Sequence, residues 1–107
     1  MNKGEIWLVE LPSTNGHEQT GMRPAVVLAK APNMIVTVPL TSNPISMRFP
    51  YTVEIDPSKT NGLNTHSVAL LFQIRAIDKK RLKYSIGELE NKIVKQVDVT
   101  LRKMLAL

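Results

Sequence analysis

Short hydrophobic runs, separated by turn-forming residues, fill the first three quarters of the chain. They predict five strands, over residues 5–9, 24–29, 34–40, 51–55 and 67–74. Residues 51–55 alternate between apolar and polar positions, which is typical of a strand with one buried face. Residues 24–29 are apolar throughout, as expected for a strand that is buried on both faces. Turn-forming clusters, such as Ser-Thr-Asn-Gly at 13–16, separate these runs.

The pattern changes in the last quarter of the chain. Asp78 predicts the N-cap of a short helical turn over 79–82, and residues 84–87 predict a short closing strand. Beyond it, apolar residues recur in steps of three and four, at Leu89, Ile93, Val97, Leu101, Met104 and Leu105. This spacing predicts an amphipathic C-terminal helix. The whole pattern predicts one mainly β domain, residues 1–107, with a curved, barrel-like antiparallel sheet covered by that helix.

Composition narrows the possible functions. No apolar run is long enough to span a bilayer, and the N-terminus does not resemble a signal peptide, so we expect a cytoplasmic location without a membrane partner. There is no cysteine, and the two histidines are far apart among scattered carboxylates. We therefore expect no metal site and no cofactor. The net charge of +5 favours a polyanionic partner, nucleic acid above all.

Arg23 stands where a polar loop meets the apolar run 24–29. One interpretation is structural, with the aliphatic stem packed on the sheet and the guanidinium bonded to the loop. The other is functional, with the guanidinium presenting its donors to a phosphate at the rim of a groove. Pro24 supports the functional interpretation, because it restrains Arg23 to an extended backbone and so fixes the direction of its side chain.

Two further candidates lie near polar turns. Thr41 and Ser42 follow the predicted third strand, where hydroxyl groups usually satisfy turn amides but can also bond a phosphate or relay a proton. A threonine hydroxyl needs help to act as a base at neutral pH. His17 is the nearby residue of suitable type, although it can equally be an ordinary loop histidine.

Other side chains carry weaker signals. The basic residues between Lys79 and Lys83 can form a solvated face or attract RNA. Among the few aromatic residues, Phe49 and Tyr51 flank a loop and are the best candidates for stacking on bases.

Five blocks in order resemble the MazF/PemK (Kid) family of toxin endoribonucleases: GEIWLVELP, GHEQTGMRPAVVL, VPLTS, SVALLFQIRAIDKKRL and IGEL. The resemblance covers nearly the whole chain. It implies an SH3-like barrel of the PemK/CcdB type with a C-terminal helix, usually in a homodimer. It also implies metal-independent, sequence-specific cleavage of single-stranded RNA, mRNA included, by a toxin that a cognate antitoxin holds in check.

The same resemblance assigns roles to individual residues. It implies that Arg23 and Thr41 are catalytic and that His17 is a third catalytic candidate. The residues that it implies for RNA binding are Gly16, Glu18, Gln19, Ser42 and Gln73. The PemK/Kid branch uses an arginine and an aspartate where this chain has Leu70 and Phe72, so the site resembles the Arg/Thr arrangement of the MazF type instead.

These residues predict a transesterification, in which the ribose 2′-hydroxyl attacks the neighbouring phosphorus and leaves 2′,3′-cyclic phosphate and 5′-hydroxyl ends. Two alternatives from other classes stay open. One is a toxin of the same fold that binds gyrase without chemistry of its own, as CcdB does. The other is a non-catalytic RNA-binding module of SH3-like fold, in which Arg23 merely contacts phosphate.

Overall fold

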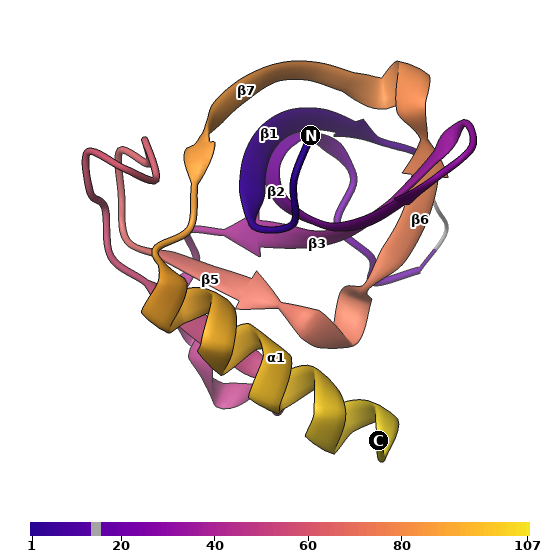
Figure 1. The fold of residues 1–107 in the computed structure, drawn as a ribbon. Coiled ribbons are helices and arrows are strands. Elements are labelled where there is room, and N and C mark those ends of the chain that lie inside the picture. Colours follow the sequence, from indigo (N-terminus) through magenta and orange to yellow (C-terminus); the bar gives the residue numbers. More distant parts are fainter. Residues whose placement is uncertain (14–15) are drawn as a thin grey trace.

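A computed structural model describes residues 1–13 and 16–107. Within this part of the chain, one antiparallel sheet holds seven strands: β1 (Glu5–Leu11), β2 (Gly21–Ala31), β3 (Met34–Thr41), β4 (Thr52–Ile55), β5 (Ser67–Leu70), β6 (Arg75–Asp78) and β7 (Leu82–Glu88). The strand order is β4-β5-β3-β2-β1-β7, with β6 also paired to β3. The sheet curls strongly (Figure 1), but no described hydrogen-bonded pairing joins β4 to β7. The mainly β prediction is confirmed, with an open sheet in place of a closed barrel.

Four helical segments accompany the described strands: η1 (Pro44–Arg48), η2 (Leu71–Gln73), η3 (Lys79–Arg81) and α1 (Asn91–Leu105). The predicted cap of the short turn is confirmed, because the Asp78 side chain accepts a hydrogen bond of 2.9 Å from the Lys80 backbone N–H. The predicted C-terminal helix is also present, although Leu89 precedes it. Leu89 instead donates its backbone N–H to the Gly4 carbonyl at 2.8 Å, which fixes the entry to the helix.

The predicted continuous strand over 67–74 is wrong, because η2 interrupts it after Leu70. Both β5 and β6 pair with β3, at Leu40↔Ala69 and Thr37↔Arg75 respectively. These two registers differ by three residues, and the three residues of η2 accommodate the difference. An apolar run cannot reveal such a break, because Leu71 stays fully buried within the 3-10 turn.

The hydrophobic core has two parts. The larger part lies between the sheet and α1, where Ile93 and Val97 pack with buried residues of the strands such as Val26 and Leu40. The smaller part consists of Val9, Leu11, Ala25 and Ile77, with Trp7 and Leu82 packed against it. Because β1 and β2 contribute to both parts, the segment that carries Arg23 belongs to a strand with buried residues on both faces, as the apolar run predicted.

Candidate active site

Arg23 is a half-buried residue of β2, opposite Val9 of β1. Its Nε donates a hydrogen bond of 3.0 Å to the carbonyl oxygen of Thr20, in the loop that precedes the strand. Within the described part of the chain, the two terminal nitrogens of the guanidinium have no hydrogen-bond partner. The loop therefore orients the side chain through one donor and leaves the outer donors for another group.

Thr41 ends β3 and is buried, with 8% of its surface exposed. Its Oγ1 accepts a hydrogen bond of 3.2 Å from the Asn43 backbone N–H, and this bond does not use the hydroxyl proton. The β2–β3 ladder pairs Ala25 with Pro39, and the same register extended by two residues brings Arg23 opposite Thr41. The hairpin therefore aligns two residues that are 18 positions apart in the sequence.

Both residues line one pocket of about 500 Å³. Its lining includes Arg23, Thr41 and the exposed Ser42, three residues that the sequence singled out. The remaining lining comes from Met22, Pro24, Leu40, Gly62, Leu63, Asn64, Thr65, Ser67, Tyr84, Ser85 and Ile86. Sequence reasoning missed the β4–β5 loop and β7 as parts of the site. The block IGEL covers the end of β7 but indicated no role in a site, and only the folded sheet brings these segments beside Arg23.

The predicted loop residues lie outside this lining. Gln73 of η2 holds the loop, because its Oε1 accepts a hydrogen bond of 2.8 Å from the Gln19 backbone N–H. Its Nε2 donates at 3.5 Å to the His17 carbonyl, and Arg75 donates at 3.3 Å to the Gln19 carbonyl. Gly16 and Glu18 belong to the same loop and are exposed. The turn predicted at 13–16 includes residues 14 and 15, which lie outside the described residues. The structure does not bring the His17 imidazole into the pocket with Arg23 and Thr41.

The two aromatic stacking candidates are also outside the pocket. Phe49 packs edge-on against Phe72, with their ring centroids 5.6 Å apart, and Tyr51 is 40% exposed. Phe72 is exposed, whereas Leu70 is buried in the core. The two positions at which this chain departs from the PemK/Kid pattern thus differ in their environment, one at the surface and one inside.

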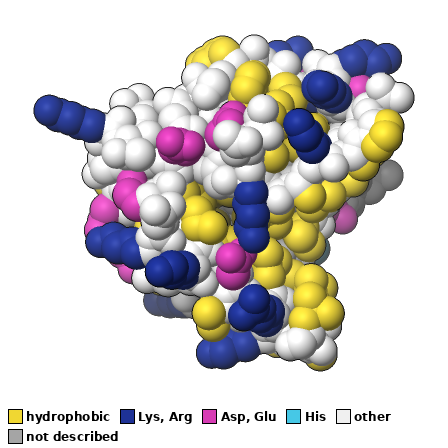
Figure 2. All heavy atoms as spheres, viewed as in Figure 1, with side chains coloured by type: hydrophobic (Ala, Val, Ile, Leu, Met, Phe, Trp, Pro, Cys, Tyr) yellow, Lys and Arg dark blue, Asp and Glu magenta, His cyan; other side chains and the backbone are white. Residues whose placement is uncertain are grey.

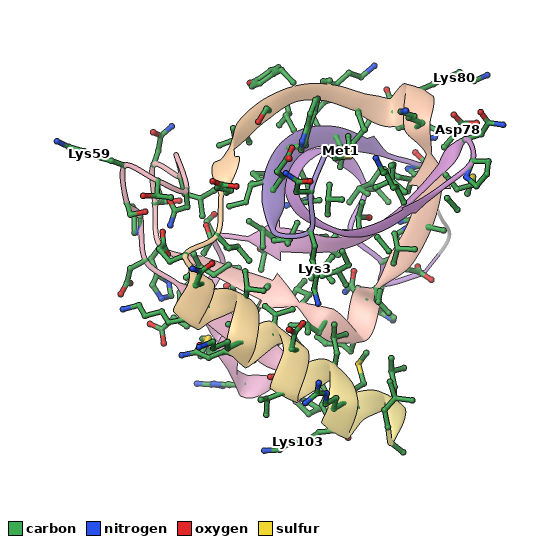
Figure 3. All side chains as sticks on the ribbon, in the orientation of Figure 1. Met1, Lys3, Lys59, Asp78, Lys80 and Lys103 are labelled. Carbon is green, nitrogen blue, oxygen red and sulfur yellow. The ribbon has the colours of Figure 1, made fainter. Side chains whose placement is uncertain are left out.

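Charged side chains are dispersed over the face of the molecule that Figure 2 shows. On the face shown in Figure 2, Lys and Arg side chains alternate with acidic and apolar ones and form no single basic patch. Asp78 and Lys80 project at the corner between β6 and β7, at the opposite side of the view from Lys59 on the β4–β5 loop (Figure 3). No residue of η3 lines the pocket that contains Arg23.

One cluster of potential metal ligands forms among the described residues, where the sequence predicted none. Glu54, Asp56 and His66 each place one donor atom within 4.8 Å of the others. The extended β4–β5 register brings Asp56 opposite His66, and His66 Nε2 is bonded to the Glu54 carboxylate. Both carboxylates are exposed, and none of the three residues lines the pocket with Arg23.

Comparison with known proteins identifies the family to which the chain belongs. Residues 2–105 match the family model of the PemK-like, MazF-like toxins of type II toxin–antitoxin systems, so the chain belongs to that family. It is 36% identical to the endoribonuclease MazF of Staphylococcus saprophyticus over 104 residues, 92% of this chain and 85% of that one. It is 35% identical to the endoribonuclease EndoA of Bacillus subtilis over 113 residues, 100% of this chain and 96% of that one.

Solved structures give the same result. The crystal structure of MazF from Deinococcus radiodurans superposes with a TM-score of 0.76 at 26% identity, covering 98% of this chain and 94% of that one. The family resemblance that the five sequence blocks indicated is thereby confirmed. No helix in the described part of the chain is long and apolar enough to cross a membrane.

Proposed function

We propose that this chain is the toxin of a type II toxin–antitoxin pair and acts as a sequence-specific endoribonuclease on single-stranded RNA, mRNA included. Family membership supports the activity, and both relatives named above are endoribonucleases. The observation that carries the proposal is the pocket itself. It contains a guanidinium oriented by the Thr20 carbonyl and a threonine hydroxyl from the next strand.

The proposed reaction needs neither a water nucleophile nor a metal, because RNA supplies its own attacking oxygen. The ribose 2′-oxygen bonds to the neighbouring phosphorus while the bond from phosphorus to the 5′-oxygen breaks. The 2′-hydroxyl loses its proton and the departing 5′-oxygen gains one. The products are a 2′,3′-cyclic phosphate and a 5′-hydroxyl end.

Arg23 carries the extra negative charge that develops on the phosphoryl oxygens. A guanidinium stays protonated in proteins, so Arg23 is a permanent donor and cannot be the base. Because its Nε already donates a hydrogen bond to the Thr20 carbonyl, the two outer nitrogens of the guanidinium are held in place before RNA binds. The Thr41 hydroxyl donates a hydrogen bond to the same phosphate and so fixes the position of that phosphate. The exposed Ser42 beside it adds a second hydroxyl.

The loop that contains Gly16, Glu18 and Gln19 forms the neighbouring part of the RNA-binding surface. Gln73 holds this loop in position through its two hydrogen bonds to the backbone. The Oε1 of Gln19 is buried without a hydrogen-bond partner among the described residues.

The test is to sequence the 5′ ends left on a long transcript by wild-type protein and by variants, in buffer with EDTA. Arg23→Ala is expected to lower the cleavage rate by about 10²–10³-fold, the usual effect of removing a preorganised donor. Arg23→Lys is expected to remain impaired, since an ammonium cannot reproduce the planar fork. Thr41→Val, which keeps the shape and removes the hydroxyl, is expected to be slower, and Thr41→Ser is expected to retain activity.

His17→Ala serves as the comparison variant within the same loop. Because the His17 imidazole lies outside the pocket, we expect the rate to fall by less than about tenfold, below the 10²–10⁴-fold typical of a general acid or base. Near wild-type cleavage by Arg23→Ala, or loss of wild-type activity in EDTA, would contradict the proposal. Intact RNA together with inhibited gyrase supercoiling would favour the gyrase-binding alternative.

Partners and location complete the proposal. We propose that the single toxin domain works as a cytoplasmic homodimer and that a cognate antitoxin binds it. An acidic, disordered antitoxin segment that orders on binding complements the net charge of +5. Exposed apolar side chains on η1, directly after it and on η2 offer a surface for the second subunit, and they include Ile45, Met47, Phe49 and Phe72.

A further inference from the structure

The pocket has a second wall that contains none of the site residues predicted from the sequence. One part of this wall is the β4–β5 loop at residues 62–65, and the other is β7 at residues 84–86. These segments face the pocket together with Arg23 and Thr41, yet neither belongs to the proposed reaction centre. The question is what this wall recognises.

The loop half of the wall is held rigidly by Asn61, which is fully buried. Asn61 Oδ1 accepts hydrogen bonds of 3.0 Å from the backbone N–H groups of both Ser58 and Leu63. Its Nδ2 donates at 2.8 Å to the Asp56 carbonyl, so one side chain bridges three points of the loop. The residues that follow Asn61 into the pocket wall therefore start from a fixed backbone.

The loop is also packed directly against β7. A Cβ at Gly87 would lie 2.6 Å from the carbonyl oxygens of Thr60 and Asn61, and one at Gly62 would overlap the carbonyl oxygen of Ile86. Gly62 also has a φ of +68°, a conformation that favours glycine. The backbone N–H of Glu88 donates to Thr60 at 3.0 Å across this contact. Two glycines thus let the loop and the strand form one preorganised surface.

Tyr84 lies on the strand half of this wall. Leu8 of β1 pairs with Pro24 of β2 on one side and with Tyr84 of β7 on the other. Tyr84 therefore lies two strand spacings, about 10 Å, from Pro24, which follows Arg23 in the chain. The side chain is 58% exposed, and its hydroxyl has no hydrogen-bond partner in the described part of the chain. A large aromatic ring that is open to a pocket can stack on a nucleobase.

Asn64 is on the loop half of the same wall, and its side chain is exposed. Its amide has both donor and acceptor groups, neither of which has a partner among the described residues. Paired donors and acceptors are what single-stranded RNA recognition uses to read base edges, while aromatic side chains stack on the base faces. Asn64 supplies a paired donor and acceptor, and Tyr84 supplies an aromatic ring.

We propose that Tyr84 and Asn64 form a base-recognition subsite of the proposed nuclease, which takes an unpaired nucleobase next to the phosphate held by Arg23 and Thr41. The base stacks on the Tyr84 ring, and the Asn64 amide hydrogen-bonds its edge. This inference rests on the proposed function, because it needs RNA in the pocket. It makes the second wall a determinant of which sequences are cleaved.

The test compares variants on two readouts, 5′-end mapping of a long transcript and affinity for an RNA oligonucleotide that carries 2′-deoxyribose at the mapped cleavage position. Tyr84→Ala is expected to weaken binding of this oligonucleotide about 10–100-fold, the usual effect of losing one stacked base. Tyr84→Phe is expected to bind like wild type, because it keeps the ring. Asn64→Asp, which removes the donors and keeps the acceptors, is expected to change the base frequency at one position of the cleaved sequence.

Tyr51→Asn is the matched control. It removes another exposed tyrosine ring, at a residue outside the pocket lining, and asparagine tolerates the φ of +58° at this position. We expect unchanged affinity and cleavage sequence. Urea unfolding of each variant verifies that it is folded under the assay conditions.

Two failures are distinguishable. If wild-type protein cuts no RNA, the proposed nuclease function fails. If wild type cuts RNA, and folded Tyr84→Ala and Asn64→Asp keep its affinity and cleavage sequence, the subsite is overturned while the nuclease function stands. An equal loss of affinity in Tyr84→Phe and Tyr84→Ala would also overturn the stacking role.

Discussion

The side chain of Arg23 combines two tasks at the scale of a single residue. One donor, Nε, is used inside the protein, where it bonds the Thr20 carbonyl. The outer donors stay available at the pocket, because no described residue accepts hydrogen bonds from them. The structural and functional interpretations of this arginine are therefore compatible, since the internal hydrogen bond is what holds the guanidinium in place for a substrate.

A second residue-scale arrangement governs stability at low pH. Glu5 accepts hydrogen bonds from the Trp7 indole N–H at 2.9 Å and from the Asn2 backbone N–H at 2.6 Å. These bonds lower the pKa of Glu5 below its ordinary value of 4.5, with the Trp7 bond as the largest cause. The stabilisation is therefore complete above the unfolded-state pKa and is lost as the pH falls through the lower, folded-state pKa.

We predict that Glu5→Gln destabilises the protein at pH 6.5 by less than about 1 kcal/mol, because the carboxylate is only partly buried. The difference in unfolding free energy between wild type and variant is expected to shrink as the pH is lowered towards 3. Urea unfolding at a series of pH values measures it. A difference that stays constant from pH 6.5 to pH 3 would show that the ionised carboxylate is not the source.

At the scale of elements, the end of α1 carries a conformational cost. Ala106 follows the helix in the left-handed region, with a φ of +57°. The backbone N–H of Leu107 donates to the Arg102 carbonyl at 2.9 Å, and that of Ala106 donates to the Lys103 carbonyl at 3.4 Å. This is the Schellman arrangement, in which glycine is the preferred residue at the left-handed position.

Ala106→Gly is accordingly expected to stabilise the protein, by about 0.5–1 kcal/mol, because glycine adopts this conformation without a steric penalty. The midpoint of urea unfolding measures the change. Ala76→Gly is the opposite control, since Ala76 lies within β6 with ordinary strand pairing, and there glycine is expected to destabilise. An Ala106→Gly protein less stable than wild type would mean that the left-handed cap does not form in solution.

For the whole molecule, the exposed apolar side chains form a candidate subunit interface. Phe49 and Phe72 are 52% and 40% exposed and contact each other, and Ile45 on η1 is 59% exposed. Apolar groups gathered in this way mark interaction surfaces in soluble proteins. This surface does not overlap the lining of the pocket, so two subunits can associate while each pocket stays open to RNA.

We predict that Phe49→Asp weakens the homodimer, because a carboxylate would have to be desolvated in the interface. Sedimentation velocity over a range of protein concentrations measures the shift towards monomer. Val99→Asp provides a control on an apolar residue of similar exposure, 50%, that lies on α1 outside η1 and η2. If both variants dissociate equally, or if neither dissociates, the subunit interface does not lie at Phe49.

The sequence by itself determined the main elements and the family. The apolar runs and the steps of three and four predicted most strands and the helix, because burial against one core imposes those periods on any chain of this fold. Local chemistry was also readable, as with the Asp78 cap, since the residues involved are neighbours in the chain. The five ordered blocks indicated the PemK-like, MazF-like family, which the comparisons confirmed.

Only the tertiary structure decided how distant segments combine. The break at η2 follows from two registers on β3, and the open edge between β4 and β7 follows from strand pairing that no local pattern encodes. The same holds for the site. Arg23 and Thr41 were identifiable in the sequence, but the wall that contains Tyr84 and Asn64 was not. It exists because Gly62 and Gly87 allow two backbone segments that are distant in the sequence to approach each other closely.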